Sequence, residues 1–191
     1  MTHTHPSDRL HRRPFWPSAL GFLGATLALL GSPAVAQSGA KGSQAHIAAV
    51  TQKVNESFIR SNAGATTDWP THGLDYAETR HSRLDQINAA NVKDLGLVWS
   101  YNLESTRGVE ATPLVVDGIM YVTASWSVVH AIDVRTGQRI WTYDPQVPRE
   151  AGFKGCCDVV NRGVALYEGK VYVAAYDGRL VALDAATGQR L

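Results

Sequence analysis

Two adjacent cysteines, Cys156 and Cys157, are the residues whose types and spacing most suggest chemistry, and they are the only cysteines of the chain. The Cα atoms of an ordinary disulfide lie about 4.4 to 6.8 Å apart, whereas those of neighbours across a trans peptide lie about 3.8 Å apart. A bridge between the two would therefore be strained, and such strain persists mainly at functional sites. Such a bridge would add little to the stability of the fold, because the loop that it closes is so short. The alternative, from the pair alone, is two reduced cysteines that pack as small hydrophobic side chains.

The N-terminus predicts export. Three arginines precede an uncharged run over residues 14–30, and the small residues Ala34-Val35-Ala36 follow. This pattern is typical of a secretory signal peptide, so we assign residues 1–36 to a cleavable signal and expect a periplasmic protein. An uncleaved anchor is the alternative, although the run is short of the roughly 20 apolar residues that span a membrane. An oxidising compartment would allow Cys156 and Cys157 to remain bridged.

The charge balance excludes one class of partner. The chain carries 18 Lys and Arg residues against 17 Asp and Glu residues, which leaves a formal net charge of +1. A nucleic-acid-binding domain would show a basic excess or a basic patch. We therefore expect no nucleic-acid partner, and no stable membrane insertion once the signal is cleaved.

Residues 37–96 predict an N-terminal segment of helices and loops. One amphipathic helix that ends before Gly64 is predicted by four apolar residues at helical spacing. These residues are Ile47, Val50, Val54 and Phe58. Turn-forming residues over 62–80 predict a long ordered loop. A second, short helical segment is expected over residues 82–95, where Asn88 and Asn91 are candidate breaks.

The pattern then changes to short strands separated by turn signals. Asp117-Gly118 and Thr136-Gly137 stand between successive runs that are apolar or β-branched. Such runs predict β-hairpins. The predicted strands are Leu97–Tyr101, Leu114–Val116, Ile119–Ala124, Val128–Asp133 and Arg139–Tyr143.

The strand pattern repeats after 51 residues. Ala131-Ile132-Asp133 returns as Ala182-Leu183-Asp184, and Thr136-Gly137-Gln138-Arg139-Ile140 returns as Thr187-Gly188-Gln189-Arg190-Leu191. Four short strands per unit at this period are typical of the blades of a β-propeller. A single β-sandwich with chance similarity is the alternative.

The repeated residues are expected to have structural roles. Asp133 and Asp184 should accept hydrogen bonds from the following turn, and Gly137 and Gly188 should supply its positive φ. Trp141 is expected to pack between blades.

Within the same region we predict no catalytic residue and no metal ligand. His130 is expected to be a strand histidine with a satisfied hydrogen bond, and no histidine pair has metal-ligand spacing. The sequence contains no CxxCH haem-attachment motif. The stretch Trp99-Ser100-Tyr101 is similar to Trp141-Thr142-Tyr143 and is expected to close an earlier, partial blade.

The repeats, together with Gly155-Cys156-Cys157-Asp158-Val159-Val160-Asn161-Arg162-Gly163 and Val109-Glu110-Ala111-Thr112-Pro113, resemble the quinoprotein alcohol dehydrogenases that use pyrroloquinoline quinone (PQQ). The resemblance covers about residues 54–191. In Asp75–Arg80 and Arg83–Asn91 the chain is similar to the quinohaemoprotein ethanol dehydrogenases. This resemblance implies an all-β, eight-bladed propeller with tryptophan-type repeats. Residues 97–191 would then form about its first two blades, as a truncated, N-terminal piece.

The resemblance also implies a cofactor site. The bridged Cys156 and Cys157 would stack flat on one face of the quinone. Glu110 and Arg162 match family positions that bind polar groups of the cofactor, and a guanidinium suits a carboxylate or a quinone oxygen. The alternative for these two residues is an ion pair between a surface glutamate and an arginine at a strand end.

The function implied by the resemblance is oxidation of primary alcohols such as ethanol to aldehydes, with PQQ and Ca²⁺ as cofactors and electrons passed to a cytochrome c. The catalytic base and the calcium ligands would lie outside this chain, and a haem c would belong to a further C-terminal domain. Residues 37–191 alone are therefore expected to be inactive. A non-catalytic propeller scaffold of the cell envelope is the alternative, although it has no use for adjacent cysteines.

Overall fold

The structure is a computed structural model, and it describes residues 39–191, all within one compact unit. The predicted signal peptide over residues 1–36 lies outside the described residues. Within the described range no helix is both long enough and apolar enough to cross a membrane.

Two helices begin the described chain, where the apolar spacing predicted one. They are α1 (Gln44–Thr51) and α2 (Glu56–Ala65). The prediction of a single helix is wrong because Asn55 begins a new helix, as its side chain accepts a hydrogen bond from the backbone N–H of Phe58. The predicted end before Gly64 is also wrong, since α2 includes Gly64.

The break between α1 and α2 contacts a distant turn. The carbonyl of Thr51 accepts a hydrogen bond from the N–H of Gly169 at 3.0 Å, and the carbonyl of Val54 accepts one from Glu168 at 2.7 Å. In a continuous helix these carbonyls would be bonded within the helix. The break therefore fastens the helical segment to a strand turn.

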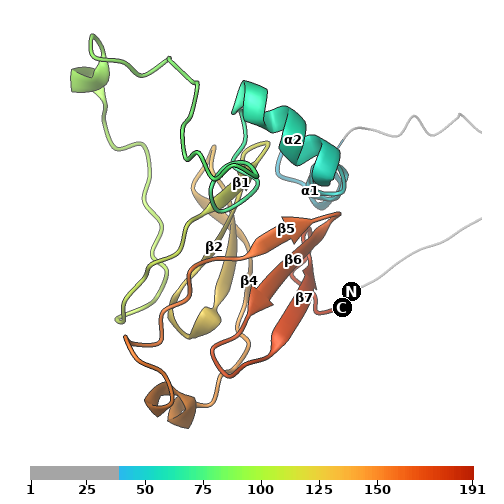
Figure 1. Ribbon diagram of the computed structural model, residues 1–191, viewed down its shortest axis with the longest axis vertical. Coiled ribbons are helices and arrows are strands. Elements are labelled where there is room, and N and C mark those ends of the chain that lie inside the picture. Colours follow the sequence, from blue (N-terminus) through green and yellow to red (C-terminus); the bar gives the residue numbers. More distant parts are fainter. Residues whose placement is uncertain (1–38) are drawn as a thin grey trace, which may run out of the picture. The chain divides into compact units, whose positions relative to one another are not determined.

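An arm without strands follows α2 and extends from the rest of the fold (Figure 1). The predicted helix over residues 82–95 is wrong, since only a 3₁₀ turn, η1 (Val92–Asp94), forms there. The side chain of Asn88 accepts from the N–H of Ala90, and that of Asn91 accepts from the N–H of Asn88. Such local bonds compete with helical hydrogen bonding. The loop predicted over residues 62–80 is shortened, because α2 occupies its first residues.

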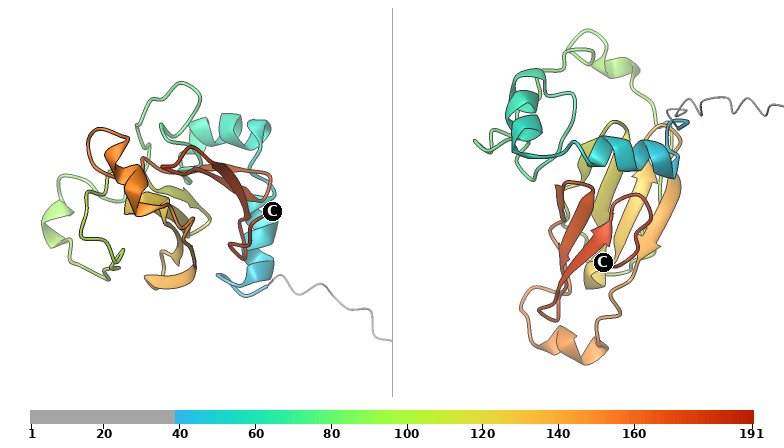
Figure 2. Two further views of the ribbon diagram at one scale, coloured as in Figure 1. Left: turned by 90° about the horizontal axis from the view of Figure 1, so that it is seen from below. Right: turned by 90° about the vertical axis from the view of Figure 1, so that its right-hand side faces the viewer.

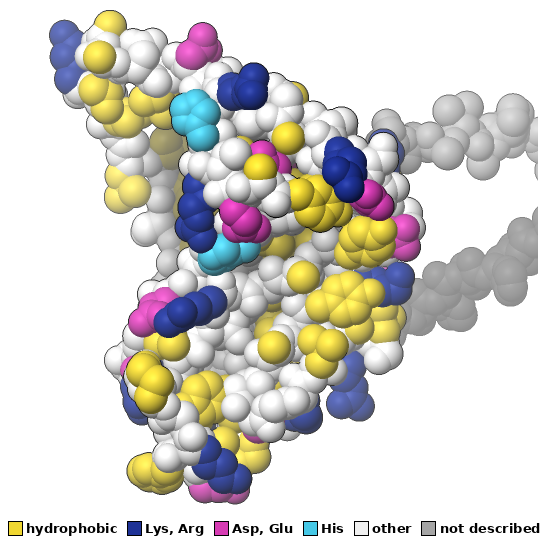
Figure 3. Space-filling view, in the orientation of Figure 1, with side chains coloured by type: hydrophobic (Ala, Val, Ile, Leu, Met, Phe, Trp, Pro, Cys, Tyr) yellow, Lys and Arg dark blue, Asp and Glu magenta, His cyan; other side chains and the backbone are white. Residues whose placement is uncertain are grey.

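Exposed apolar side chains gather on this arm (Figure 3). They are Leu84, Ile87, Val92, Leu95, Leu97 and Val98. The prediction of a strand over Leu97–Tyr101 is wrong, since within residues 39–191 no strand pairs with this stretch.

Two antiparallel sheets form the rest of the fold and lie side by side (Figure 2). Each is a meander in which successive strands are neighbours, as the repeat predicted for propeller blades. The first sheet contains β1 (Leu114–Val116), β2 (Ile119–Thr123), β3 (Val129–Asp133) and β4 (Gln138–Tyr143). The second contains β5 (Ala165–Tyr167), β6 (Lys170–Ala174) and β7 (Leu180–Asp184).

Trp141 packs between the two sheets, which confirms its predicted role. Its indole N–H donates to the carbonyl of Ala185 at 3.0 Å. Its ring lies over Gly188, so close that a Cβ there would come within 2.7 Å of the indole. The Tyr121 hydroxyl also donates to the Ala185 carbonyl, at 2.9 Å.

Trp99 makes the same contacts one repeat earlier. Its indole N–H donates to the carbonyl of Val134 at 2.8 Å, and its ring lies over Gly137. Gly137 has a φ of 70° and Gly188 a φ of 72°, as predicted. The carboxylates of Asp133 and Asp184 accept hydrogen bonds from the following turns, which confirms their predicted roles.

Candidate functional site

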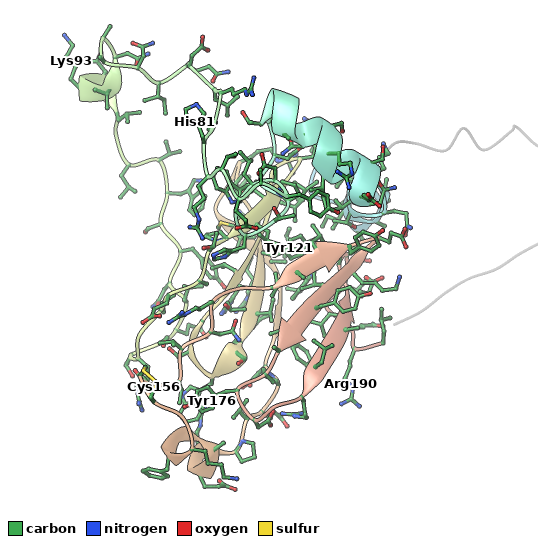
Figure 4. All side chains as sticks on the ribbon, viewed as in Figure 1. His81, Lys93, Tyr121, Cys156, Tyr176 and Arg190 are labelled. Atoms are coloured by element: carbon green, nitrogen blue, oxygen red, sulfur yellow. A yellow bond between two sulfur atoms is a disulfide. The ribbon has the colours of Figure 1, made fainter. Side chains whose placement is uncertain are left out.

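Cys156 and Cys157 are joined by a disulfide and are exposed. They lie in the connection from β4 to β5, just after the 3₁₀ turn η3 (Arg149–Phe153). The sulfur of Cys156 lies at the outer edge of the view in Figure 4. The alternative of two reduced, buried cysteines is therefore wrong, and the bridge is open to solvent.

Asp158, the residue directly after the disulfide, is held by three hydrogen bonds to its carboxylate. It accepts hydrogen bonds from the guanidinium of Arg107, from the N–H of Val159 at 2.7 Å and from the N–H of Gly108 at 3.2 Å. The hydrogen bond from Arg107, followed by the two backbone donors, lowers the pKa of Asp158 to about 2. Asp158 is therefore ionised throughout the neutral range and binds all three donors as a carboxylate.

The side chain of Asn161 makes a second set of contacts that hold the disulfide loop. The amide of Asn161 donates to the carbonyl of Ala174 at 2.9 Å and to the hydroxyl of Ser127 at 3.1 Å, and it accepts from the N–H of Gly163 at 3.0 Å. The N–H of Trp126 donates to the carbonyl of Val159 at 2.9 Å. The disulfide loop is therefore bonded to the connection between β2 and β3 of the first sheet and to the end of β6 in the second.

Glu110 and Arg162 are brought together by the fold. The guanidinium of Arg162 donates to the carboxylate of Glu110 at 3.2 Å, and the two side chains remain 74% and 48% exposed. The N–H of Thr112 also donates to the carbonyl of Arg162. The ion pair considered as an alternative is thus present, but exposed pairs of this kind contribute little to stability. Both groups remain accessible to a ligand.

Sequence reasoning assigned no role to Arg107 or Asp158, although a signal for their pairing exists. They are 51 residues apart, which is the period of the repeat, and each stands the same number of residues before the first strand of its sheet. Equivalent loops of neighbouring repeats lie side by side in a propeller, since each repeat packs on the next. The Glu110 and Arg162 pair, 52 residues apart, follows nearly the same rule.

Aromatic residues support the other side of the loop. Gly155 leaves room for the hydroxyl of Tyr176, which a Cβ at that position would hit. The Tyr176 ring meets Trp126 edge to face, with centroids 6.4 Å apart, and the guanidinium of Arg149 lies 4.2 Å above the Trp126 ring. Sequence reasoning missed these contacts, although Trp126 and Tyr176 are 50 residues apart, close to the 51-residue period of the repeat.

A cleft of about 470 Å³ lies beside this site, between the segment 103–107 and the sheet. His130 lines it, buried, with Nδ1 at 3.1 Å from the hydroxyls of Tyr101 and Thr142. The expected hydrogen bond is confirmed at Nδ1, whereas Nε2 has no partner among the described residues. Burial lowers the pKa of His130, so the imidazole is neutral at pH 7.

The arrangement suits a planar ligand that carries carboxylates. The disulfide offers a rigid, polarisable surface, and Arg162 offers paired donors to an anion. Among residues 39–191 no group of three or more His, Cys, Asp or Glu side chains is placed to hold a metal ion.

Comparison with known proteins gives one consistent result. Residues 69–191 match the family described as "PQQ: Glucose/ethanol/alcohol dehydrogenase, beta-propeller domain". The quinohemoprotein alcohol dehydrogenase of Comamonas testosteroni is 72% identical over 177 residues, which cover 92% of this chain and 24% of that protein. The 1-butanol dehydrogenase (cytochrome c) of Thauera butanivorans is 70% identical over 124 residues, or 65% of this chain and 18% of that protein.

A solved structure agrees with the sequence comparison. The crystal structure of the quinohemoprotein alcohol dehydrogenase from Comamonas testosteroni matches with a TM-score of 0.76 and 78% identity, over 78% of this chain and 22% of the solved chain. The chain therefore spans about a quarter of the length of these relatives or less.

Proposed function

The chain belongs to the family of PQQ-dependent glucose, ethanol and alcohol dehydrogenase β-propellers, and we propose that it supplies one wall of the cofactor site of such an alcohol dehydrogenase. The single observation that carries the proposal is the exposed disulfide between Cys156 and Cys157, in the same loop as Arg162, which pairs with Glu110. A structural disulfide would close a longer loop and would gain nothing from exposure.

The residues present fit the quinone. A planar, aromatic cofactor requires a flat and rigid surface, and hydrogen bonds of Asp158 and Asn161 hold the disulfide loop to the rest of the fold. The carboxylates and quinone oxygens of PQQ are acceptors, which suits the exposed guanidinium of Arg162. Glu110 can only accept, so its partner on the cofactor would be an N–H or a hydroxyl.

When bound, the quinone supplies the acceptor for a hydride removed from the alcohol carbon. The residues of this chain bind and orient that group. The disulfide fixes the plane of the ring, Arg162 fixes its rotation within that plane, and Glu110 keeps Arg162 directed at the site when the cofactor is absent. Orientation of this kind is a large part of what a protein contributes to cofactor chemistry.

The finer features of the proposal rest on the relatives. One is named a quinohemoprotein alcohol dehydrogenase and another a 1-butanol dehydrogenase (cytochrome c), which supports an alcohol substrate and a cytochrome acceptor. We extend this to a periplasmic enzyme that oxidises primary alcohols such as ethanol, with Ca²⁺ bound by residues outside this chain and a haem c in a further domain. The scaffold alternative is less well supported, because these relatives are enzymes.

The test is reconstitution of the full-length protein that contains this chain. Apoenzyme with added PQQ and Ca²⁺ should reduce an artificial electron acceptor when ethanol or 1-butanol is supplied, and the 191-residue chain alone should not. Quinone binding without turnover of any primary alcohol would contradict the proposed substrate class. No binding of PQQ by the full-length protein would contradict the proposed function altogether.

A further inference from the structure

We infer that Arg107 and Asp158 are positioning residues for the quinone, which hold the Cys156–Cys157 disulfide in the orientation that the cofactor meets. The inference rests on the proposed function and adds to it two residues that contact the disulfide loop rather than the cofactor. Neither Arg107 nor Asp158 was among the residues that the sequence analysis predicted for the cofactor site.

The backbone beside the disulfide needs such support. Cys157 and Asp158 both have a φ of 72°, in the left-handed region that disfavours residues with a side chain. This conformation is unfavourable for a residue with a side chain, and it persists only where surrounding contacts impose it. In the connection from β4 to β5, these are the only two successive residues with a positive φ.

The Asp158 carboxylate supplies those contacts. Its oxygens accept from Arg107, from Gly108 and from Val159, so one side chain joins the turn to the loop that precedes β1. Arg107 has no other anionic partner among the ion pairs of residues 39–191. The pair therefore acts as a single link between two neighbouring repeats.

The position of this link gives it a role in binding. Asp158 is the residue directly after Cys157, so a change in its backbone angles turns the sulfur of Cys157 with it. Gly108, bonded to the same carboxylate, is two residues before Glu110, and Asp158 is four residues before Arg162. Loss of the link would therefore misalign the disulfide relative to the two polar groups of the site.

The fold itself does not depend on the link. Asp158 and Arg107 are partly exposed, and the loop keeps the separate contacts of Asn161 with Ser127 and Ala174. An exposed ion pair contributes little to global stability. A positioning role and a structural role thus predict different results.

The experiment compares three variants of the full-length protein, Asp158→Asn, Arg107→Gln and the double variant, with Glu56→Gln as control. Glu56 and Arg60 form an exposed pair of the same kind on α2, remote in sequence from the site. The dissociation constant for PQQ is measured by titration of the apoenzyme. Thermal unfolding and hydrogen exchange of a peptide that covers residues 155–160 are measured without the quinone.

We expect each single variant to raise the dissociation constant about tenfold, the range seen when groups that orient a ligand-binding residue are removed. The double variant should raise it no further, because the two side chains form one link. Exchange in residues 155–160 should be faster in all three, and the melting temperature should stay within about 2 °C of wild type. The control should change none of these.

Three results would overturn the inference. One is unchanged quinone affinity in the Asp158→Asn variant while the wild type binds PQQ. Another is effects of the two single variants that add in full, as for independent residues. The third is a fall in the melting temperature of a variant so large that part of its apoenzyme is unfolded in the titration, which would explain the weaker PQQ binding. Failure of the wild type to bind PQQ would instead contradict the proposed function, and the inference with it.

Discussion

The turns of the repeat and the disulfide loop both contain an aspartate paired with an arginine and a backbone with positive φ. They differ in how far apart the paired residues are and in which residues have the positive φ. In the turn after β3, the carboxylate of Asp133 binds Arg135, two residues away, and the positive φ falls on Gly137. In the disulfide loop, the carboxylate of Asp158 binds Arg107, 51 residues away, and the positive φ falls on Cys157 and on Asp158 itself.

The difference follows from what each turn must present. A turn that only connects two strands can place glycine where φ is positive and can satisfy its hydrogen bonds locally. A loop that presents sulfur atoms and a guanidinium must keep those side chains, so it needs contacts from another repeat to hold its backbone. On this account, changes in the repeat turns lower stability, whereas changes in the disulfide loop lower affinity for the quinone.

The largest effect is expected on the side of the repeats. Trp141→Ala removes a buried indole that packs on Gly188 and donates to Ala185, so it should lower the free energy of unfolding by about 3 to 5 kcal/mol. Urea unfolding of the full-length protein measures this. Gln138→Ala, an exposed change on the same strand, is the control and should have little effect. Equal midpoints for the two variants would show that the indole does not hold the repeats together.

The next effect belongs to the disulfide loop. Arg162→Ala removes an exposed guanidinium that the proposal assigns to the cofactor, which should weaken PQQ binding by about 1.5 to 3 kcal/mol with little change in stability. Glu110→Gln should act in the same direction but less. Titration of the two apoenzymes gives the comparison. Unchanged affinity in the Arg162 variant would remove that residue from the site.

A glycine pair tests the role of the repeat turns more finely. Gly137→Ala places a Cβ within 2.7 Å of Trp99 at positive φ, whereas Gly178→Ala places one at positive φ in open space. Both should lose about 1 to 2 kcal/mol from the left-handed conformation. Only Gly137→Ala should lose further stability, because its added methyl group clashes with Trp99. Equal losses of stability in denaturant titrations would mean that Trp99 yields to the added methyl group without cost.

The smallest effect concerns pH. The pKa of the Asp158 carboxyl is lowered from 3.8 to about 2 by its bond to Arg107, so its contribution is complete above 3.8 and is lost as the pH falls through about 2. The ratio of PQQ dissociation constants between Asp158→Asn and wild type should therefore be constant above this window and should fall within it. A ratio that already declines near neutral pH would contradict the lowered pKa.

Local chemistry made the repeat predictable. Each copy of Thr-Gly-Gln-Arg follows an aspartate, Asp133 or Asp184, so every turn has its acceptor and its glycine within one short stretch, and the turns and strands could be predicted. The packing of Trp141 on the next copy followed from the repeat itself. The adjacency of the two cysteines left both a bridge and two reduced thiols open, and the predicted export and the family resemblance favoured the bridge.

The errors arose where distant or competing contacts decide the structure. The turn at Glu168 and Gly169 interrupts the helix that the apolar spacing predicted, and the side chains of Asn88 and Asn91 bond locally in place of a second helix. The link between Arg107 and Asp158 was missed although its spacing equals the repeat. Residues one period apart are neighbours in a propeller, and this rule would have found it.

The most direct test of the central claim is a crystal structure of the full-length protein with bound PQQ. We expect the quinone ring to lie flat against the Cys156 and Cys157 sulfur atoms, Arg162 to donate to a cofactor oxygen, and Asp158 still to accept from Arg107. A quinone bound elsewhere, or two free thiols at Cys156 and Cys157 beneath a bound quinone, would contradict it.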